Sequence, residues 1–168
     1  MTAPLRLESN DEIATITLAR PEQLNALGFE MLDALVEALD AVARSDARVL
    51  VLAAQGPAFC AGADRAEMIE RKPAEWEPIV DHYLDPVRRI ADLDIPVIAV
   101  DVPSGLDAQT GMLVKFAIDA DVTVTFSCPK KGMVINMGPH QCGSVLVADI
   151  GVPRDLIENI PPDILTDQ

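Results

Sequence analysis

The amino-acid sequence predicts an α/β fold with a mostly parallel β-sheet and flanking helices. Apolar residues recur every second residue near the start of the chain, every three to four residues in two longer stretches, and without interruption in short β-branched runs. These patterns are typical of half-exposed strands, amphipathic helices and buried strands, respectively. Because strand and helix patterns alternate along the chain, we expect a largely parallel sheet covered by helices.

The chain begins with two predicted strands that should form a hairpin. Residues 5–8 and 13–18 alternate apolar and polar side chains, and residues 9–11 between them (Ser-Asn-Asp) favour a turn. Apolar residues at helical spacing then predict an amphipathic helix of about five turns over residues 24–42. The run Val-Leu-Val-Leu at 49–52 predicts a strand that is buried on both faces.

The rest of the chain continues the alternation of helix and strand. A Gly- and Pro-containing loop should separate the last two strands. The predicted elements are a short helix at 65–71, an amphipathic helix at 76–90, a buried strand at 96–100, strands at 121–126 and 144–148, and a short helix at 154–159.

Length and composition exclude several classes of protein. The chain has 168 residues, of which 49% are hydrophobic and 24% charged, so we expect one globular domain rather than a disordered or collagen-like chain. Acidic residues outnumber basic ones by 27 to 13, and no basic cluster is longer than a pair. Because nucleic acids and anionic membranes are bound by clustered Lys and Arg, we expect neither as a partner.

Cysteine usage predicts a cytoplasmic protein without disulfides. Cys60, Cys128 and Cys142 are an odd number at no metal-ligand spacing, which is typical of free thiols in a reducing compartment. The chain opens without a basic segment followed by an apolar one, so we expect no signal peptide. The uncharged run at residues 49–63 is too short to cross a membrane.

Two motifs in the first half resemble the crotonase (enoyl-CoA hydratase/isomerase) superfamily. They are Ile-Thr-Leu-Ala-Arg-Pro-Glu-Gln-Leu-Asn-Ala-Leu at 16–27 and Gly-Pro-Ala-Phe-Cys-Ala-Gly-Ala-Asp at 56–64. The resemblance implies that Ala61, Gly62, Ala63 and Asp64 bind the adenine of coenzyme A, and that the N–H of Ala63 is one of two oxyanion-hole donors. Such a donor, placed where an enolate forms from a thioester, contributes on the order of 10²–10³ in rate.

The chain departs from that family after residue 100. The Asn-Gly, glycine-rich segment that supplies the second oxyanion donor is absent, and no glutamate occurs between Asp81 and Ile157. Hydration uses carboxylates to move water and a proton. The first resemblance therefore implies binding of a coenzyme A thioester by an incomplete hydratase or isomerase site.

Residues 96–153 are similar to a different family, the C-terminal part of NAD(P)H-hydrate epimerase, which is Rossmann-like. The matching segments are Val-Asp-Val-Pro-Ser-Gly-Leu-Asp at 100–107, Ala-Asp-Val-Thr-Val-Thr-Phe at 120–126, Pro-Lys-Lys-Gly at 129–132 and Gly-Ser-Val-Leu-Val-Ala-Asp-Ile-Gly-Val-Pro at 143–153. This resemblance implies that Asp101 contacts a hydrated nicotinamide and that Ser104 contributes to a potassium site. The phosphate-binding loop of that family is absent, so a dinucleotide has no evident anchor.

The two resemblances predict a chimera that joins a crotonase-like half to a Rossmann-like half. Alanine falls from 18 residues in 1–100 to four in 101–168, and Arg gives way to Lys. Both families carry a strand that reads roughly Pro-Val-Ile-Ala-Val, found here at 96–100. We therefore expect a single α/β domain over 1–168, with halves at 1–100 and 101–168 and one continuous parallel sheet.

Three functions remain open at this stage. The chain binds an acyl-CoA through its crotonase-like half, it acts as an epimerase-like enzyme through Asp101, or it is a folded chimeric scaffold without evolved activity. The expected small-molecule partner is an acyl-CoA or a nicotinamide dinucleotide. We expect no tightly bound cofactor except K⁺ at Ser104, with coenzyme A entering as part of the substrate. Both families form oligomers, so the resemblance also implies a homo-oligomer.

Overall fold

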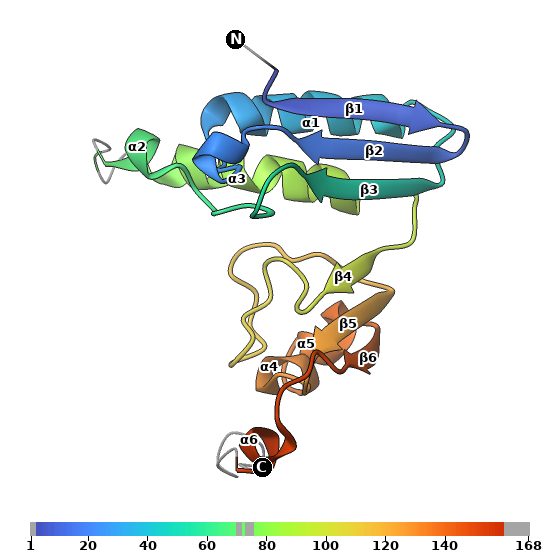
Figure 1. Ribbon diagram of the computed structural model, residues 1–168, viewed down its shortest axis with the longest axis vertical. Coiled ribbons are helices and arrows are strands. Elements are labelled where there is room, and N and C mark those ends of the chain that lie inside the picture. The colour runs from blue at the N-terminus through green and yellow to red at the C-terminus, as the bar shows by residue number, and fades with distance from the viewer. Residues whose placement is uncertain (1–2, 70–71, 73–75, 160–168) are drawn as a thin grey trace. The chain divides into compact units, whose positions relative to one another are not determined.

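The computed structural model describes residues 3–69, 72 and 76–159, and it confirms a mixed α/β architecture (Figure 1). The chain divides into two compact units, Met1–Ile95 and Pro96–Gln168. The described strands form two three-stranded sheets, one in each unit, in place of the continuous sheet that we expected. Whether the two units behave as a single domain in unfolding stays a prediction.

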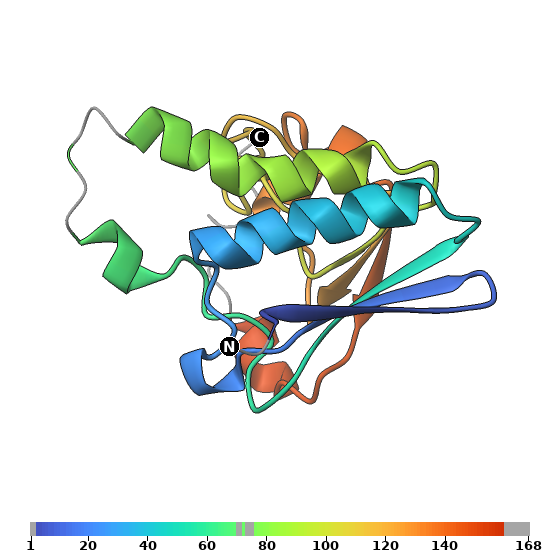
Figure 2. The same cartoon turned by 90° about the horizontal axis from the view of Figure 1, so that it is seen from above.

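The first unit is a three-stranded sheet with two long helices on one face, which run side by side in Figure 2. The first two strands form the predicted hairpin, and the third pairs in parallel with the second in the order β1-β2-β3. The elements are β1 (Leu5–Asn10), β2 (Ile13–Leu18), a 3-10 helix η1 (Pro21–Gln23), α1 (Phe29–Ala43), β3 (Val49–Ala54), α2 (Arg65–Met68) and α3 (Trp76–Ala91).

The core of this unit lies between the sheet and the helices. Ala14 and Ile16 on β2 are fully buried, and they pack with Leu39 and Val42 of α1. The alternating residues of β2 are the half-exposed ones, as the period-two pattern predicts. Burial of this face against α1 stabilises the position of the second half of β2 and of the loop that follows it.

Two predictions for the first unit are corrected by the structure. The helix expected from residue 24 begins at Phe29, because Leu24 and Asn25 adopt positive φ angles of 51° and 52° that a helix cannot contain. The strand β3 is not buried on both faces, since Val49 and Val51 are 46% and 42% exposed. It is an edge strand, and the helices cover only one face of its sheet.

The second unit contains a parallel sheet in the order β4-β5-β6. The predicted strands and the last helix are confirmed to within a few residues. The expected burial of the first strand is wrong, because Ile98 and Val100 are 66% and 67% exposed on this edge strand. The elements are β4 (Ile98–Val100), β5 (Val122–Phe126), α4 (Lys131–Val134), α5 (Gly138–Gln141), β6 (Ser144–Ala148) and α6 (Arg154–Glu158).

The segment expected to be a Gly/Pro loop contains the short helices α4 and α5. Their glycines permit close packing, because a Cβ on Gly138 would lie 1.8 Å from the carbonyl oxygen of Gly132. Met133 of α4 packs with Leu106 and Cys142 in a small core. The parallel sheet is as predicted, while the Rossmann-like character of this half stays a prediction. Among the described helices of the chain, none combines the length and apolar character of a membrane span.

Candidate functional site

The motif at 56–64 forms a loop that is fixed by a buried asparagine. Asn25 is 0% exposed, and its Nδ2 donates to the carbonyl oxygens of Gln55 and Ala58, both at 2.9 Å. Its Oδ1 accepts a hydrogen bond from the N–H of Arg20 at 2.9 Å. From the sequence, Asn25 was only part of the motif at 16–27. The structure shows that its side chain joins this motif to residues 55–58, which are distant in the chain.

The same loop is paired with residues 24–27 through backbone hydrogen bonds. The N–H of Leu27 donates to the carbonyl of Gly62 at 2.8 Å, and the N–H of Asp64 donates to the carbonyl of Leu27 at 3.0 Å. These two bonds form an isolated parallel bridge between Leu27 and Ala63. The Asp64 carboxylate then caps α2 by accepting from the N–H of Ala66 at 2.9 Å.

Ala63 has a backbone N–H that is available to a ligand. Among the described residues, its N–H has no hydrogen-bond acceptor, and Ala63 itself is exposed. In a parallel bridge, the N–H of the central residue points away from the paired segment. An unused N–H on a fixed loop is a geometry that can bind a developing oxyanion.

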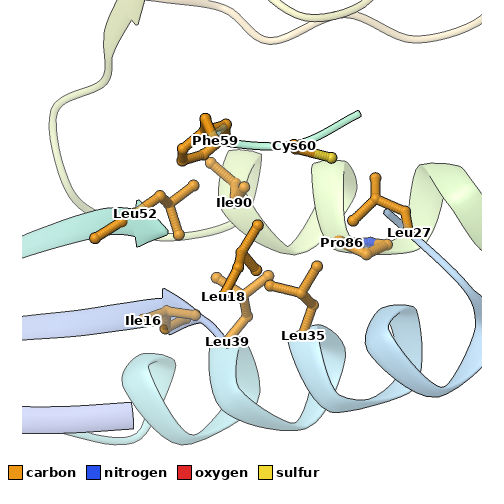
Figure 3. Close-up of a pocket in the computed structure, with 11 residues that line it drawn as sticks. Ile16, Leu18, Leu27, Leu35, Leu39, Leu52, Phe59, Cys60, Pro86 and Ile90 are labelled. Atoms are coloured by element: carbon orange, nitrogen blue, oxygen red, sulfur yellow. The ribbon is translucent and has the colours of Figure 1, made fainter. Parts of the chain in front are cut away.

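An apolar cavity of about 140 Å³ lies beside this loop (Figure 3). Leu18 of β2, Leu39 of α1 and Ile90 of α3 contribute to its walls, and Leu27 and Cys60 lie toward the same end in the close-up. Leu27 is also the bridge partner of Ala63. The cavity is therefore suited to a short hydrocarbon group whose polar end is near the loop.

Tyr83 connects α3 to Leu27, the bridge partner of this loop, whereas the sequence pattern predicted only that residue 83 lies in an amphipathic helix at 76–90. Its hydroxyl donates to the carbonyl oxygen of Leu27 at 2.5 Å. Burial raises the pKa of Tyr83 above its ordinary value. The nearby N–H of Asp64 lowers the pKa, while the negative charges of Glu67 and Asp64 raise it further. The hydroxyl therefore keeps its proton and acts as a donor.

A second polar cluster lies in the other unit, where Asp101 follows the carboxyl end of β4. The Oδ1 atom of Asp101 accepts hydrogen bonds from Lys130 Nζ, from Thr125 Oγ1 at 3.2 Å and from the N–H of Phe126 at 3.1 Å. The Lys130 ammonium also donates to Thr125 Oγ1 at 2.9 Å and to the Phe126 carbonyl at 3.0 Å. Asp101 has a φ of 69°, which is uncommon for a residue with a side chain.

The charge state of Asp101 follows from these contacts. Burial raises the pKa of Asp101, but the hydrogen bonds from Lys130, Phe126 and Thr125, together with the positive charge of Lys130, lower it below its ordinary value. Asp101 is therefore a carboxylate at neutral pH. The sequence predicted no role for Lys130 beyond its place in the motif at 129–132, because its partner Asp101 lies 29 residues away in the chain.

The predicted site residues fall into two groups that belong to different units. Ala61, Gly62, Ala63 and Asp64 form one loop of the first unit, whereas Asp101 and Ser104 belong to the second. Ser104 is exposed in a turn, and its carbonyl accepts from the N–H of Ile118 at 2.9 Å.

The potassium site expected at Ser104 stays a prediction. Potassium needs several oxygen ligands, and Ser104 itself has one exposed hydroxyl. No group of three or more His, Cys, Asp or Glu side chains gathers in the described part of the chain in a way that could hold a metal.

Comparisons with known proteins give matches to both predicted families. The model of the enoyl-CoA hydratase/isomerase family matches residues 8–131, beyond the expected boundary at residue 100. A solved structure of an enoyl-CoA hydratase from Mycobacterium smegmatis is 33% identical and covers 73% of this chain and 48% of that chain, with a TM-score of 0.55. This chain thus spans about half the length of that solved relative.

The curated relatives are similar over shorter stretches. An NAD(P)H-hydrate epimerase from Limosilactobacillus fermentum is 42% identical over 72 residues, which are 43% of this chain and 35% of that protein. A bifunctional NAD(P)H-hydrate repair enzyme from Moorella thermoacetica is 48% identical over 60 residues, which are 36% of this chain and 11% of that protein. The chain therefore spans about a third or less of these relatives.

Matches to both families in one chain are consistent with the predicted chimera. The epimerase matches are partial, whereas the enoyl-CoA hydratase/isomerase model extends over well more than half of the chain. The protein therefore belongs to the enoyl-CoA hydratase/isomerase family.

Proposed function

We propose that the first unit binds a short-chain coenzyme A thioester, with the thioester carbonyl on the N–H of Ala63. The observation that carries this proposal is the unused N–H of Ala63 on a fixed loop whose bridge partner, Leu27, lines an apolar cavity. The carbonyl oxygen of a thioester is an acceptor for this donor, and the cavity offers the acyl chain an apolar environment. The matches to enoyl-CoA hydratases support coenzyme A as the carrier of the acyl group.

The site supports binding better than it supports hydration. A hydratase needs carboxylates that deliver water and a proton, and no glutamate occurs between Asp81 and Ile157. One N–H donor can polarise the carbonyl, but it supplies neither the nucleophile nor the proton. We therefore expect hydration of enoyl-CoA to be far slower than ordinary enzyme turnover of about 1–10³ per second.

The proposal is tested by calorimetric titration with coenzyme A and with acyl-CoAs of increasing chain length. Burial of a methylene contributes about 0.8 kcal/mol, so we expect affinity to rise about fourfold per methylene until the cavity is full. Equal affinities for free coenzyme A and for its short-chain acyl thioesters would refute the proposal.

A matched pair of variants assigns the effect to the cavity. Leu52 lines the cavity from β3 and pairs with Ile16, which lines the same cavity, so Leu52→Trp should fill part of the space and remove the gain in affinity with chain length. Val51, the preceding residue on the same strand, is not part of the lining, is equally exposed at 42%, and its side chain points to the opposite face of the sheet. The variant Val51→Trp should keep the dependence on chain length, and a loss in both variants would contradict the assignment.

A second candidate function is favoured by the Asp101 cluster. A carboxylate that is held by Lys130 at the carboxyl end of a parallel strand lies where α/β folds place their chemistry. The partial similarity to NAD(P)H-hydrate epimerases supports a nicotinamide dinucleotide as its ligand. If epimerase activity is present, Asp101→Asn should abolish it, because the amide keeps the shape of the side chain but not its charge. Epimerase activity that is unchanged in Asp101→Asn would contradict a catalytic role of Asp101.

A further inference from the structure

Tyr83 is the one side chain of α3 that reaches the backbone of the Leu27–Ala63 bridge through a hydrogen bond in the described structure. Its hydroxyl and the N–H of Asp64 donate to the same acceptor, the carbonyl oxygen of Leu27, at 2.5 Å and 3.0 Å. A carbonyl oxygen has two lone pairs, so it can accept both bonds at once. The Leu27 carbonyl is therefore bound on one side by the loop and on the other by α3.

The position of Ala63 depends on this carbonyl. Ala63 makes no backbone hydrogen bond through its own N–H, and it is held by the bonds of its neighbours, Gly62 and Asp64, to Leu27. Gly62 has a φ of 88°, and no atom would contact a Cβ built on it within 4 Å, so the loop has open space on that side. Because side-chain packing does not hold Gly62, the hydrogen bonds of Leu27 help to determine where the N–H of Ala63 points, together with the bond from the N–H of Gly62 to Cys60 Sγ at 3.3 Å.

Tyr83 is itself held by the helix that forms the cavity wall. Pro86 and Ile90, one and two turns further along α3, line the cavity on the same face of the helix. The Tyr83 hydroxyl therefore links α3, which forms part of the cavity wall, to Leu27 of the bridge. The hydroxyl is bonded to Leu27, whereas the N–H of Ala63 points away from Leu27 in the parallel bridge, so Tyr83 acts on the bridge and not on the proposed thioester carbonyl.

We propose that Tyr83 is a positioning residue, whose hydrogen bond to the Leu27 carbonyl aligns the N–H of Ala63 with the carbonyl of a thioester bound in the cavity. This inference rests on the proposed function. The alignment needs the phenol to be protonated, and burial together with the neighbouring negative charges raises the pKa of Tyr83 above 10.0, its ordinary value. The donor is therefore present throughout the neutral range of pH.

The test compares Tyr83→Phe, which removes only the hydroxyl, with a matched control. Ser45→Ala removes another hydroxyl that donates to a backbone carbonyl, from Ser45 to Val42 at 2.7 Å, at the opposite end of α1 from the loop. Both variants lose one hydrogen bond from a hydroxyl to a carbonyl, and Ser45→Ala also loses the bond that Ser45 Oγ accepts from the N–H of Ala47 at 3.2 Å. An effect on the loop that appears only in Tyr83→Phe is therefore not a general loss of stability.

The first measurement is amide hydrogen exchange of the free protein, which needs no ligand. We expect exchange in residues 60–64 to become about fivefold faster in Tyr83→Phe, as the loss of one net hydrogen bond predicts, and to stay unchanged in Ser45→Ala. Exchange in residues 60–64 that is the same in Tyr83→Phe and wild type would overturn the inference.

The second measurement is the infrared carbonyl stretch of butyryl-coenzyme A bound to each protein. A hydrogen bond to the thioester oxygen lowers this frequency, so we expect a smaller shift in Tyr83→Phe than in wild type and in Ser45→Ala. Affinity for free coenzyme A should be the same in all three proteins. An equal shift in wild type and Tyr83→Phe overturns the positioning role. A wild-type protein that binds no thioester refutes the proposed function. In that case, hydrogen exchange in residues 60–64 still tests whether Tyr83 holds the loop.

Discussion

Single side chains that bond across long sequence separations determine the geometry of both candidate sites. Asn25, Tyr83 and Lys130 each join segments that are between 29 and 56 residues apart. The sequence could predict the loop at 61–64 and Asp101, because local motifs carry them. It could not predict the roles of these three residues, because a hydrogen-bond partner is defined by the fold and leaves no periodic signal in the sequence.

We expect Asn25→Ala to destabilise the protein strongly, because it removes three hydrogen bonds of a fully buried side chain and leaves three partly buried backbone groups without this partner. Asn136→Ala is a matched control, since Asn136 also has a positive φ (50°, against 52° for Asn25) but is exposed and donates one bond, to Thr110. Urea unfolding should show a loss about 3 kcal/mol larger for Asn25→Ala. Equal losses would show that the buried hydrogen bonds contribute little.

The ion pair of Asp101 predicts a dependence of stability on pH. The folded state lowers the pKa of Asp101, so the carboxylate stabilises the fold fully above its unfolded pKa of about 3.9 and loses this contribution as the pH falls through the lower folded value. The effect should be modest, because the Asp101 side chain is 40% exposed. We expect the stability difference between wild type and Asp101→Asn, measured by urea unfolding, to shrink from pH 5 toward pH 2. A difference that stays constant over this range would contradict the ion pair.

At the scale of elements, the sequence predicted the order and type of nearly every helix and strand but not their environment. The alternating pattern of β2 specifies its buried face, and this prediction is confirmed. Continuous apolar runs predicted burial on both faces for β3 and β4, and this was wrong because both are edge strands of small sheets. An apolar run shows that a strand can be buried. Whether it is buried depends on the other segments of the chain that pack on its two faces, and the run itself does not specify them.

The exposed edge of β3 predicts that the protein associates with itself at high concentration. Edge strands with exposed apolar side chains pair readily with other chains. We expect Val51→Lys, at a position that is 42% exposed, to reduce association measured by light scattering without a large loss of stability. Leu50→Lys is the contrasting variant, because Leu50 packs on the core and a charge there should unfold the unit. Association that is unchanged by Val51→Lys would show that this edge does not mediate it.

At the scale of the whole molecule, the chain has two compact units that meet at Ile95 and Pro96 without a Gly/Ser or charged linker. The second unit, Pro96–Gln168, is of a size that is marginal when isolated, because such a core supplies only about 3–5 kcal/mol. We therefore expect one cooperative transition in calorimetry of the full chain. Two separate transitions, or a stable proteolytic fragment ending near residue 95, would show that the units fold independently.

The most direct measurement of the proposed function is the amide resonance of Ala63 in the NMR spectrum during titration with butyryl-coenzyme A. We predict that this resonance moves downfield on addition of the thioester, because a free N–H gains a carbonyl acceptor, and that free coenzyme A moves it much less. A thioester that binds while the Ala63 resonance stays in place would contradict the assignment of Ala63 as the donor to the thioester carbonyl.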